Sequence, residues 1–369
     1  MSLRTLADVR RRRLATQRLA SSGLPRGADV VRLLTCIQSQ AAPLAAWSLA
    51  MRMRPRTTYA EVLAEQLAGG WVRTHILRPT WHFVAPEDVR WIQRATGPKV
   101  ESSLAGRHRG LELDHATVGR ALEALCELLT GPTPMTRRQL TAAFAARGLA
   151  SSGEQMAHQL LIAELRTVIC SGPPRGAEHT YVLVEETLPS SPSDRLEGEA
   201  ARRELVRRFV SGHGPASERD LVRWSTLTLT EIRAGLADLS DVLEHVEIDG
   251  HTLWFDPAVP ARTTKPHPAY LVPTFDEVSL TYAQTGFPRR NPKVTRQRPL
   301  SEIAGGTVIL DGEDVAAWKR LVSRSAVHVT VSPDVPLRGP DRAAVVDAAE
   351  RLARFLELPL ELEVKRAPR

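Results

Sequence analysis

Apolar residues recur at helical spacing over residues 30–37 of the chain. One face of the helix that this spacing predicts carries Val30, Leu33, Leu34 and Ile37. Asp29 precedes that face and is the expected N-cap. Pro43 has no N–H to donate to the carbonyl of Ser39, and it disfavours helical geometry at the residue before it. The helix is therefore expected to loosen over residues 39–42.

Two glutamines lie at this predicted helix end, in the tripeptide Gln38-Ser39-Gln40. Residues two apart diverge by roughly 200° around a regular helix, whereas in an extended stretch they point to the same side. A carboxamide both donates and accepts hydrogen bonds, so the pair could hold a water molecule in a fixed pose. The alternative interpretation is a polar helix end that faces solvent.

The pattern next predicts a helix through Trp47 and Met51, a helix over Thr58–Leu67 and paired strands within residues 71–88. His75 and His82 are seven residues apart on these strands, so they should lie on opposite faces of the sheet. That separation argues against a metal ion shared by the two imidazoles.

Two later segments resemble each other. Residues 131–140 align with residues 212–221, and Thr136 and Ser217 are both expected N-caps. In each copy a short helix, a longer helix and a strand–turn–strand follow. Helices followed by a hairpin are the plan of a winged-helix domain.

The chain is accordingly expected to have an α+β fold. Three tandem winged-helix domains are predicted over residues 1–112, 113–190 and 195–260, with a linker at residues 189–193. Residues 261–369 are rich in proline and β formers and are predicted to form a small C-terminal β-rich domain with a final helix over Asp341–Leu356.

Charge is unevenly distributed along the 369 residues. The chain has 49 Lys and Arg against 42 Asp and Glu, a net charge of +7. Residues 1–110 hold 18 basic and 7 acidic residues, so the rest holds 31 basic and 35 acidic residues and no basic excess. Such asymmetry favours a polyanionic partner, and nucleic acid is the default. The expected DNA contacts in this segment are Arg52, Arg54, Arg56, Arg78 and His82.

A second basic feature is the proline-stiffened loop Phe287–Lys293. Loops of this kind suit phosphate or groove contacts, so Arg289, Arg290 and Lys293 are predicted to bind DNA. A solvated hairpin tip is the alternative.

Other polar residues leave alternatives open. Asp276 and Glu277 follow an apolar strand and are either a catalytic acid pair or an ion pair to the basic first segment. His267 lies in Lys-Pro-His-Pro, which is expected to be a rigid loop and not a ligand site.

The three cysteines, Cys36, Cys126 and Cys170, are far apart and indicate small buried residues in a reducing compartment. Neither a zinc site nor any other cofactor is expected. No run approaches the roughly 20 apolar residues of a membrane span, and the basic N-terminus has no apolar signal core. A cytoplasmic location is therefore expected.

Four stretches together carry a family resemblance: IQSQAAPLAAWSLAMR, RTHILRPTWHFVAPED, GPASERDLVRW with DGHTLWFDP, and AYLVPTFDEVSLTYA. Through them the whole chain resembles the bacterial winged-helix DNA glycosylases that excise alkylated bases and unhook interstrand crosslinks. The resemblance implies a basic channel and a Gln-x-Gln or Gln-x-Asp catalytic motif, matched by Gln38 and Gln40. Ser39 and Pro79 depart from the residues common in relatives, and these departures bear on substrate range.

The resemblance implies a monofunctional glycosylase for N7-alkylated purines in double-stranded DNA, including crosslinks from an alkylating antibiotic, in DNA repair and self-resistance. An N7-alkylated guanine is cationic and leaves readily, so a positioned water attacking C1′ suffices. With no obvious lysine nucleophile, no lyase step is expected, and no obligatory protein partner is expected. A winged-helix DNA-binding regulator without activity and a protein that sequesters a toxin are the alternatives.

Overall fold

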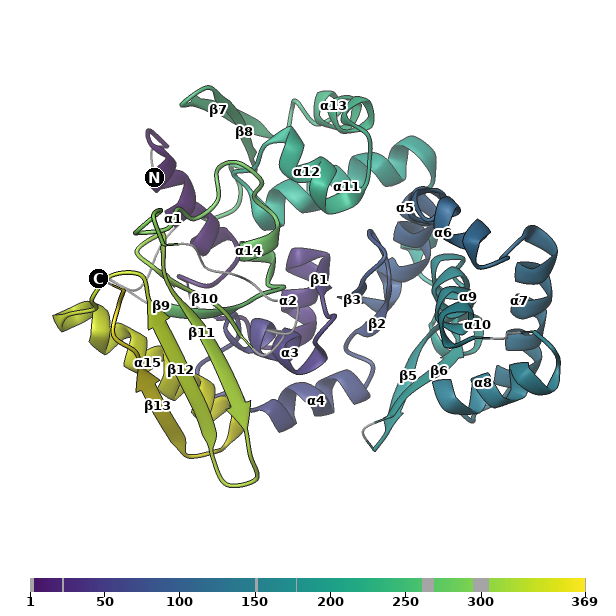
Figure 1. Ribbon diagram of the computed structural model, residues 1–369. Helices are drawn as coiled ribbons and strands as arrows, with labels where there is room; N and C mark the ends of the chain where they lie inside the picture. Colours follow the sequence, from purple (N-terminus) through teal and green to yellow (C-terminus); the bar gives the residue numbers. More distant parts are fainter. Residues whose placement is uncertain are drawn as a thin grey trace.

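The computed structural model describes residues 3–368 except residues 22, 150–151, 177, 261–268 and 295–304. The fold is a mixture of helices and small, mostly antiparallel sheets, in agreement with the α+β prediction (Figure 1). Within the described residues, no helix is long and apolar enough to cross a membrane.

The N-terminal part folds around a three-stranded sheet. Its elements are α1 (Leu6–Thr16), α2 (Gly27–Leu34), β1 (Cys36–Gln38), α3 (Ala42–Ala50), α4 (Tyr59–Leu67), β2 (Val72–His75) and β3 (Trp81–Val84). Strand β3 lies in the middle and is antiparallel to both β1 and β2. The two predicted helices after Pro43 and the predicted paired strands are confirmed.

Helix α2 differs from its prediction at both ends. It begins at Gly27 with Arg26 as N-cap, so Asp29 lies in the first turn and the prediction that it caps the helix is wrong. The helix ends at Leu34, because Thr35 takes a positive φ of 65° and the next three residues pair with β3. A chain that pairs with a neighbouring strand cannot also continue the helical hydrogen-bond ladder, so Gln38 lies on a strand.

The middle of the chain repeats this order of elements. After η1 (Pro86–Asp88), α5 (Val89–Ser103) and α6 (Ala105–Gly110) come α7 (His115–Leu129), β4 (Met135–Thr136), α8 (Arg137–Ala146), α9 (Gly153–Leu165), β5 (Ile169–Arg175), β6 (Glu178–Leu183) and α10 (Val184–Thr187). The sheet order β4-β6-β5 places the last strand in the middle, as in β1-β3-β2. The two parts therefore share both element order and sheet order.

A third part follows η2 (Pro192–Arg195). It consists of α11 (Gly198–His213), α12 (Glu218–Ser225), α13 (Leu229–Ala237), β7 (Glu244–Ile248) and β8 (His251–Phe255). Thr136 and Ser217 each accept a backbone N–H at the start of a helix, which confirms both predicted N-caps. Helix α11 packs closely on the end of α2, since a Cβ added at Gly212 would lie 2.3 Å from the Leu33 carbonyl oxygen.

The C-terminal part is one sheet with a helix packed against it. Its elements are β9 (Ala269–Pro273), α14 (Glu277–Leu280), β10 (Gly305–Leu310), β11 (Glu313–Val322), β12 (Val327–Pro333), α15 (Gly339–Leu356) and β13 (Leu360–Val364). The strand order is β13-β12-β11-β10-β9, antiparallel except for the parallel pair β12 and β13. The predicted final helix is confirmed and begins two residues earlier.

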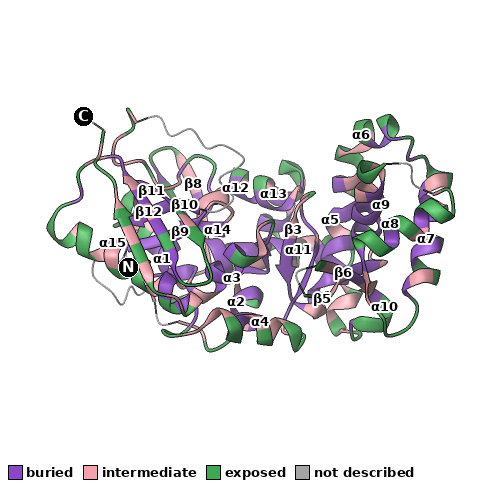
Figure 2. Cartoon of the chain, turned by 60° about the horizontal axis from the view of Figure 1, so that its bottom comes forward, coloured by how far each residue is buried: buried purple, intermediate pink, exposed green. Residues whose placement is uncertain are grey.

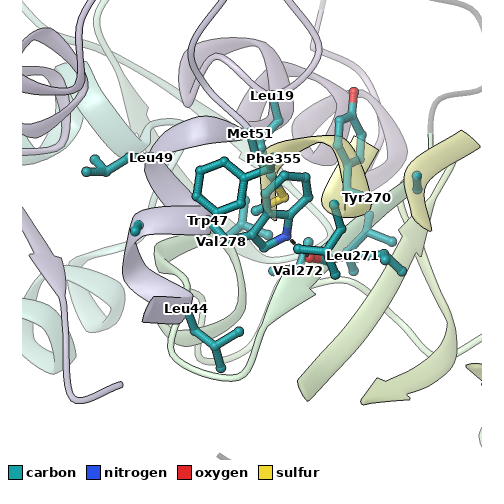
Figure 3. Close-up of a cluster of buried hydrophobic side chains, with 14 of the residues drawn as sticks. Leu19, Leu44, Trp47, Leu49, Met51, Tyr270, Leu271, Val272, Val278 and Phe355 are labelled. Atoms are coloured by element: carbon teal, nitrogen blue, oxygen red, sulfur yellow. Dashed lines mark hydrogen bonds between the residues drawn. The ribbon is translucent and has the colours of Figure 1, made fainter. Parts of the chain in front are cut away.

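This sheet shares its hydrophobic core with the first part of the chain. The Trp47 indole nitrogen donates to the Leu271 carbonyl at 2.8 Å, and the Trp47 ring packs 5.3 Å from the Phe355 ring (Figure 3). Buried residues run from α2 and α3 into β9 and β10 (Figure 2). The predicted boundary at residue 261 therefore does not separate two cores.

A buried ion pair joins the same two parts. Both terminal nitrogens of the Arg52 guanidinium donate to the carboxylate of Asp276, at 2.7 and 2.8 Å. They also donate to the Ser48 carbonyl and the Gln17 amide oxygen, each at 2.9 Å. Both charged side chains are essentially inaccessible to solvent. The prediction that Arg52 contacts DNA is therefore wrong, and the ion-pair interpretation of Asp276 is confirmed.

We expect Arg52→Ala to lower the free energy of unfolding by roughly 3–5 kcal/mol, because it leaves the Asp276 carboxylate buried without its partner. Denaturant unfolding measures the change. Arg54→Ala is the matched control, since Arg54 is exposed and such changes usually stay within about 0.5 kcal/mol. Equal unfolding midpoints for the two variants would contradict a structural role for the pair.

Candidate active site

Gln38 and Gln40 lie on an extended stretch of backbone. Gln38 ends β1 opposite His82 of β3, and the N–H of Ser39 donates to the Trp81 carbonyl at 2.7 Å. The Gln38 side chain is largely buried, with 8% exposed, whereas Gln40 is exposed. The two carboxamides are therefore not part of a helix end but of a segment held along β3.

Both carboxamides converge on the turn that joins β2 to β3. Arg78, at one end of this turn, donates to the Gln38 amide oxygen at 2.9 Å. At the other end, the Trp81 N–H makes a long contact of 3.4 Å to the Gln40 amide oxygen. An extended chain places residues two apart on the same side, which agrees with this arrangement.

His82 supports Arg78 from below the surface. The ring is fully buried, its Nδ1 lies 2.9 Å from the Thr80 carbonyl, and its Nε2 lies 3.2 Å from an Arg78 nitrogen. A carbonyl only accepts, so Nδ1 carries the proton and Nε2 accepts from Arg78. Burial and the Arg78 charge lower the pKa of His82 to about 3. The prediction that His82 contacts DNA is wrong, because its ring is inaccessible.

Glu277 forms the floor of the site. One carboxylate oxygen accepts the Gln38 backbone N–H at 3.0 Å, and the other accepts the Trp224 indole N–H at 3.1 Å and lies 3.6 Å from the His213 ring. Burial alone would raise the pKa of this carboxyl, but His213 and the Arg78 charge outweigh burial and hold the pKa at about 2. Glu277 is therefore an ionised anchor and is itself only 1% exposed.

Ser39, between the two glutamines, is also held by hydrogen bonds. Two nitrogens of Arg73 donate to the Ser39 carbonyl at 3.2 and 3.1 Å. The Arg73 guanidinium lies 3.7 Å from the centre of the Trp81 ring, which stacks on His179 of β6 at 5.1 Å. Burial lowers the pKa of Arg73 to about 10 and that of His179 to about 4. This cluster brings the second part of the chain to the site.

The predicted separation of His75 and His82 is confirmed. His75 pairs with Trp81 in the sheet and contacts the buried carboxylate of Glu164, while His82 faces Arg78. No group of His, Cys, Asp or Glu suited to holding a metal ion occurs within the described residues.

Sequence reasoning missed Arg73, Trp81, His179 and the contact from Glu277. The alternation of residues 73–88 predicts paired strands, but it does not reveal which side chains face the glutamines. His179 and Glu277 follow Gln40 by 139 and 237 residues. No local sequence pattern links residues so far apart to the two glutamines.

Arg54 and Arg56 are exposed, as DNA contacts must be, but they lie beyond the far end of α3. Helix α3, which is about 14 Å long at 1.5 Å per residue, lies between them and Gln40. With Arg351 and Arg354 of α15 they line a hollow of about 840 Å³. They remain predicted DNA contacts outside the reactive centre.

The basic loop Phe287–Lys293 is held against the C-terminal sheet. Arg290 pairs with Glu313 at 2.8 Å and Asp341 at 2.6 Å, and Arg289 donates to the Val294 carbonyl at 2.7 Å. These contacts do not support the two arginines as DNA contacts. The Lys293 side chain is exposed and remains a predicted contact.

The remaining candidates have mixed outcomes. Cys36 and Cys170 are buried free thiols as predicted, and burial raises the pKa of Cys36 and brings that of Cys170 to about 12. Cys126 is exposed, so the prediction that it is buried is wrong. His267 lies outside the described residues.

We expect the stability of the protein to depend on pH through His82. The folded ring is neutral above about pH 3, whereas the unfolded ring binds a proton below about 6.5. Between these values the unfolded state binds more protons, so stability falls with decreasing pH by up to about 1.4 kcal/mol per unit. Denaturant unfolding at pH 6 and pH 5 should show a smaller decrease for His82→Asn than for the wild type. Equal slopes would show that the folded ring is protonated.

Comparison with known proteins identifies the family and the fold of the chain. A family model described as DNA glycosylase AlkZ-like matches residues 31–355. The interstrand DNA cross-link repair glycosylase of Streptomyces sahachiroi is 24% identical over 373 residues, which cover 95% of this chain and 97% of the relative. The structure of Streptomyces sahachiroi DNA glycosylase AlkZ matches with a TM-score of 0.75 at 22% identity, over 97% of this chain and 99% of that chain, and so has the same fold. The resemblance carried by the sequence motifs is confirmed, and the chain belongs to the AlkZ-like family of DNA glycosylases.

Proposed function

We propose that this protein is a monofunctional DNA glycosylase that hydrolyses the N-glycosidic bond of N7-alkylated purines, including those in interstrand crosslinks. The observation that carries the proposal is the pair of carboxamides, Gln38 and Gln40, on one clamped extended segment beside the Arg78–Trp81 turn. Family membership favours this function over a regulator without enzymatic activity.

For this hydrolysis the protein mainly has to position the attacking water. N7 alkylation gives the purine a positive charge, so it leaves C1′ with the bonding electron pair as a neutral base. A water held by the two carboxamides adds to the sugar cation and releases its proton to solvent, which leaves an abasic site. Holding the nucleophile in line is a large part of such a barrier, and neutral dipoles suffice to hold it.

The residues around the glutamines support hydrolysis without strand cleavage. Among the described residues, the groups in hydrogen-bond contact with the two side chains are the Arg78 guanidinium and the Trp81 N–H. A guanidinium stays protonated and does not form a Schiff base with the sugar. No lyase step is therefore proposed.

The exposure of the site supports a crosslinked substrate. Gln40 is exposed and Trp81 is partly exposed, so the reactive position is reached from the surface. A base tethered to both strands resists full extrusion into an enclosed pocket. A site that delivers water at the surface does not require that extrusion. The name of the Streptomyces relative, a cross-link repair glycosylase, agrees with this substrate.

The architecture supports binding to double-stranded DNA. The first two parts share element order and sheet order, and in the third part Ala216 bridges Trp254 to extend the β7–β8 pair. We propose that all three are winged-helix domains, with residues 261–369 as the β-rich part. We further propose that Arg54, Arg56, Arg78 and Lys293 contact phosphates and that the protein serves in repair of alkylated DNA and in self-resistance.

We expect Gln38→Ala and Gln40→Ala each to slow excision on the order of 10²-fold, because neither variant can hold the water. Gln40→Asp should keep part of the activity, since a carboxylate still accepts from water, and Gln40→Leu should be inactive. Single-turnover release of N7-methylguanine from a duplex with one lesion measures the rates, with binding measured in parallel.

Gln66→Ala is the matched control, because Gln66 lies on α4 and makes none of the hydrogen bonds described for the two glutamines. It should retain wild-type excision. Near-wild-type excision by both alanine variants would refute the mechanism, and binding of the duplex with no alkali-sensitive site would point to a regulator. Binding of the free alkylating drug without excision would point to a sequestering protein.

We expect Arg54→Ala combined with Arg56→Ala to weaken duplex binding and to reduce the slope of log K against log salt by about 2, at about 0.9 per phosphate contact. Binding titrations at several salt concentrations give the slope. Arg120→Ala combined with Arg147→Ala is the control, since both residues lie on the second part of the chain at α7 and the end of α8. An unchanged slope in the first variant would place the DNA elsewhere.

A further inference from the structure

We propose that Arg78 is a positioning residue that fixes the Gln38 amide with its nitrogen toward the substrate, so that Gln38 acts as a donor and Gln40 as the acceptor. The inference deepens the proposed function and rests on it. It assigns different hydrogen-bonding roles to two side chains that have the same chemistry but different surroundings.

The orientation of the Gln38 amide follows from what faces it. An arginine guanidinium donates and cannot accept, so the Gln38 atom at 2.9 Å from Arg78 must be the oxygen. The amide is planar, and its nitrogen therefore points away from Arg78. Among the described residues, that nitrogen donates to no protein group. The two N–H bonds are left for a ligand.

Arg78 is itself held in place. One nitrogen contacts both the Gln38 oxygen and the His82 Nε2, at 2.9 and 3.2 Å. The Thr80 carbonyl fixes the His82 tautomer that leaves Nε2 free to accept. His82 stays neutral through the neutral pH range, so it accepts from Arg78 under all ordinary conditions. A supported guanidinium fixes its own partner more firmly than a free surface arginine does.

Gln40 lacks such a clamp. Its side chain is exposed, and its oxygen makes only the 3.4 Å contact to the Trp81 N–H. The oxygen is therefore available to accept from a water. A water that accepts from Gln38 and donates to Gln40 is fixed at two points and keeps a lone pair for C1′. The pair then presents one donor and one acceptor, which is the minimum that orients a nucleophilic water.

Two substitutions of the same shape test this division. In Gln38→Glu the carboxylate pairs with Arg78 but has no N–H to donate, so single-turnover excision at saturating enzyme should fall on the order of 10²-fold. In Gln40→Glu the acceptor remains, so excision should stay within about tenfold of wild type. The opposite ranking, or equal rates for both variants, would overturn the division.

Arg78→Ala tests the positioning role. It should slow excision at saturating enzyme by about tenfold or more, the size expected for loss of a charge-assisted hydrogen bond, and Arg78→Lys should recover part of the rate. Arg120→Ala, at an exposed arginine on α7, is the matched control and should change neither the excision rate nor the affinity for DNA. If Arg78→Ala changes only the affinity for DNA and its salt dependence, with excision at saturating enzyme unchanged, Arg78 acts as a phosphate contact alone and the positioning role is refuted.

A spectroscopic measurement keeps the inference separate from the proposed function. In the 15N-labelled protein without DNA, Arg78→Lys should shift the side-chain amide resonances of Gln38 and leave those of Gln40 in place. Unchanged Gln38 resonances would refute the contact whatever the enzyme does. A wild-type protein that releases no N7-methylguanine would refute the proposed substrate, while the resonances would still report the orientation of the amide.

Discussion

The arrangement of the site depends on the contacts of one buried carboxylate, that of Glu277. A charge without solvent is tolerated in a protein only where hydrogen bonds and partners replace the water. Here the partners are the Gln38 backbone N–H, the Trp224 indole and the His213 ring, which belong to three different elements. The position of β1 is therefore set by how α11 and α12 pack around α14. The neighbouring carboxylate of Asp276 binds Arg52, which follows α3. The two adjacent carboxylates therefore bind the chain before and after α3.

Much of the fold could be predicted because its signals are local. Thr58, Thr136 and Ser217 each begin a capping box, and a polar cap before an apolar period defines a helix start within four residues of sequence. The end of α2 could not be predicted in this way. Ile37 continues the helical apolar face, yet it pairs with Phe83 in the sheet, 46 residues later. Apolar periodicity shows which residues are buried but not which segment covers them. It therefore cannot distinguish a strand that continues the apolar face of a helix.

The charge asymmetry of the sequence does not show which arginines are exposed. Several arginines of the first 110 residues turn inward, where they bind carbonyls and carboxylates from distant segments. Arg13 donates to the carbonyls of residues 215 and 285, Arg52 binds a carboxylate of α14, and Arg73 holds the peptide between the glutamines. Arg54 and Arg56, only two and four residues past Arg52, are exposed. A count of charges cannot separate these groups, because a planar guanidinium with five donors suits a buried carboxylate as well as a phosphate.

The two glutamines owe their difference to tertiary structure and not to the tripeptide that contains them. Gln38 lies in a buried network of fixed donors and acceptors, while Gln40 lies at the surface beside Trp81. The Ser39 carbonyl between them is bound by a guanidinium that stacks on Trp81, and Trp81 stacks on His179 from the second part of the chain. A movement of His179 and the rest of β6 would therefore change the distance between the two carboxamides through the stack of Trp81 on Arg73. All four parts of the chain meet around the motif, so the chemistry proposed for the two glutamines depends on this packing and not on the tripeptide alone.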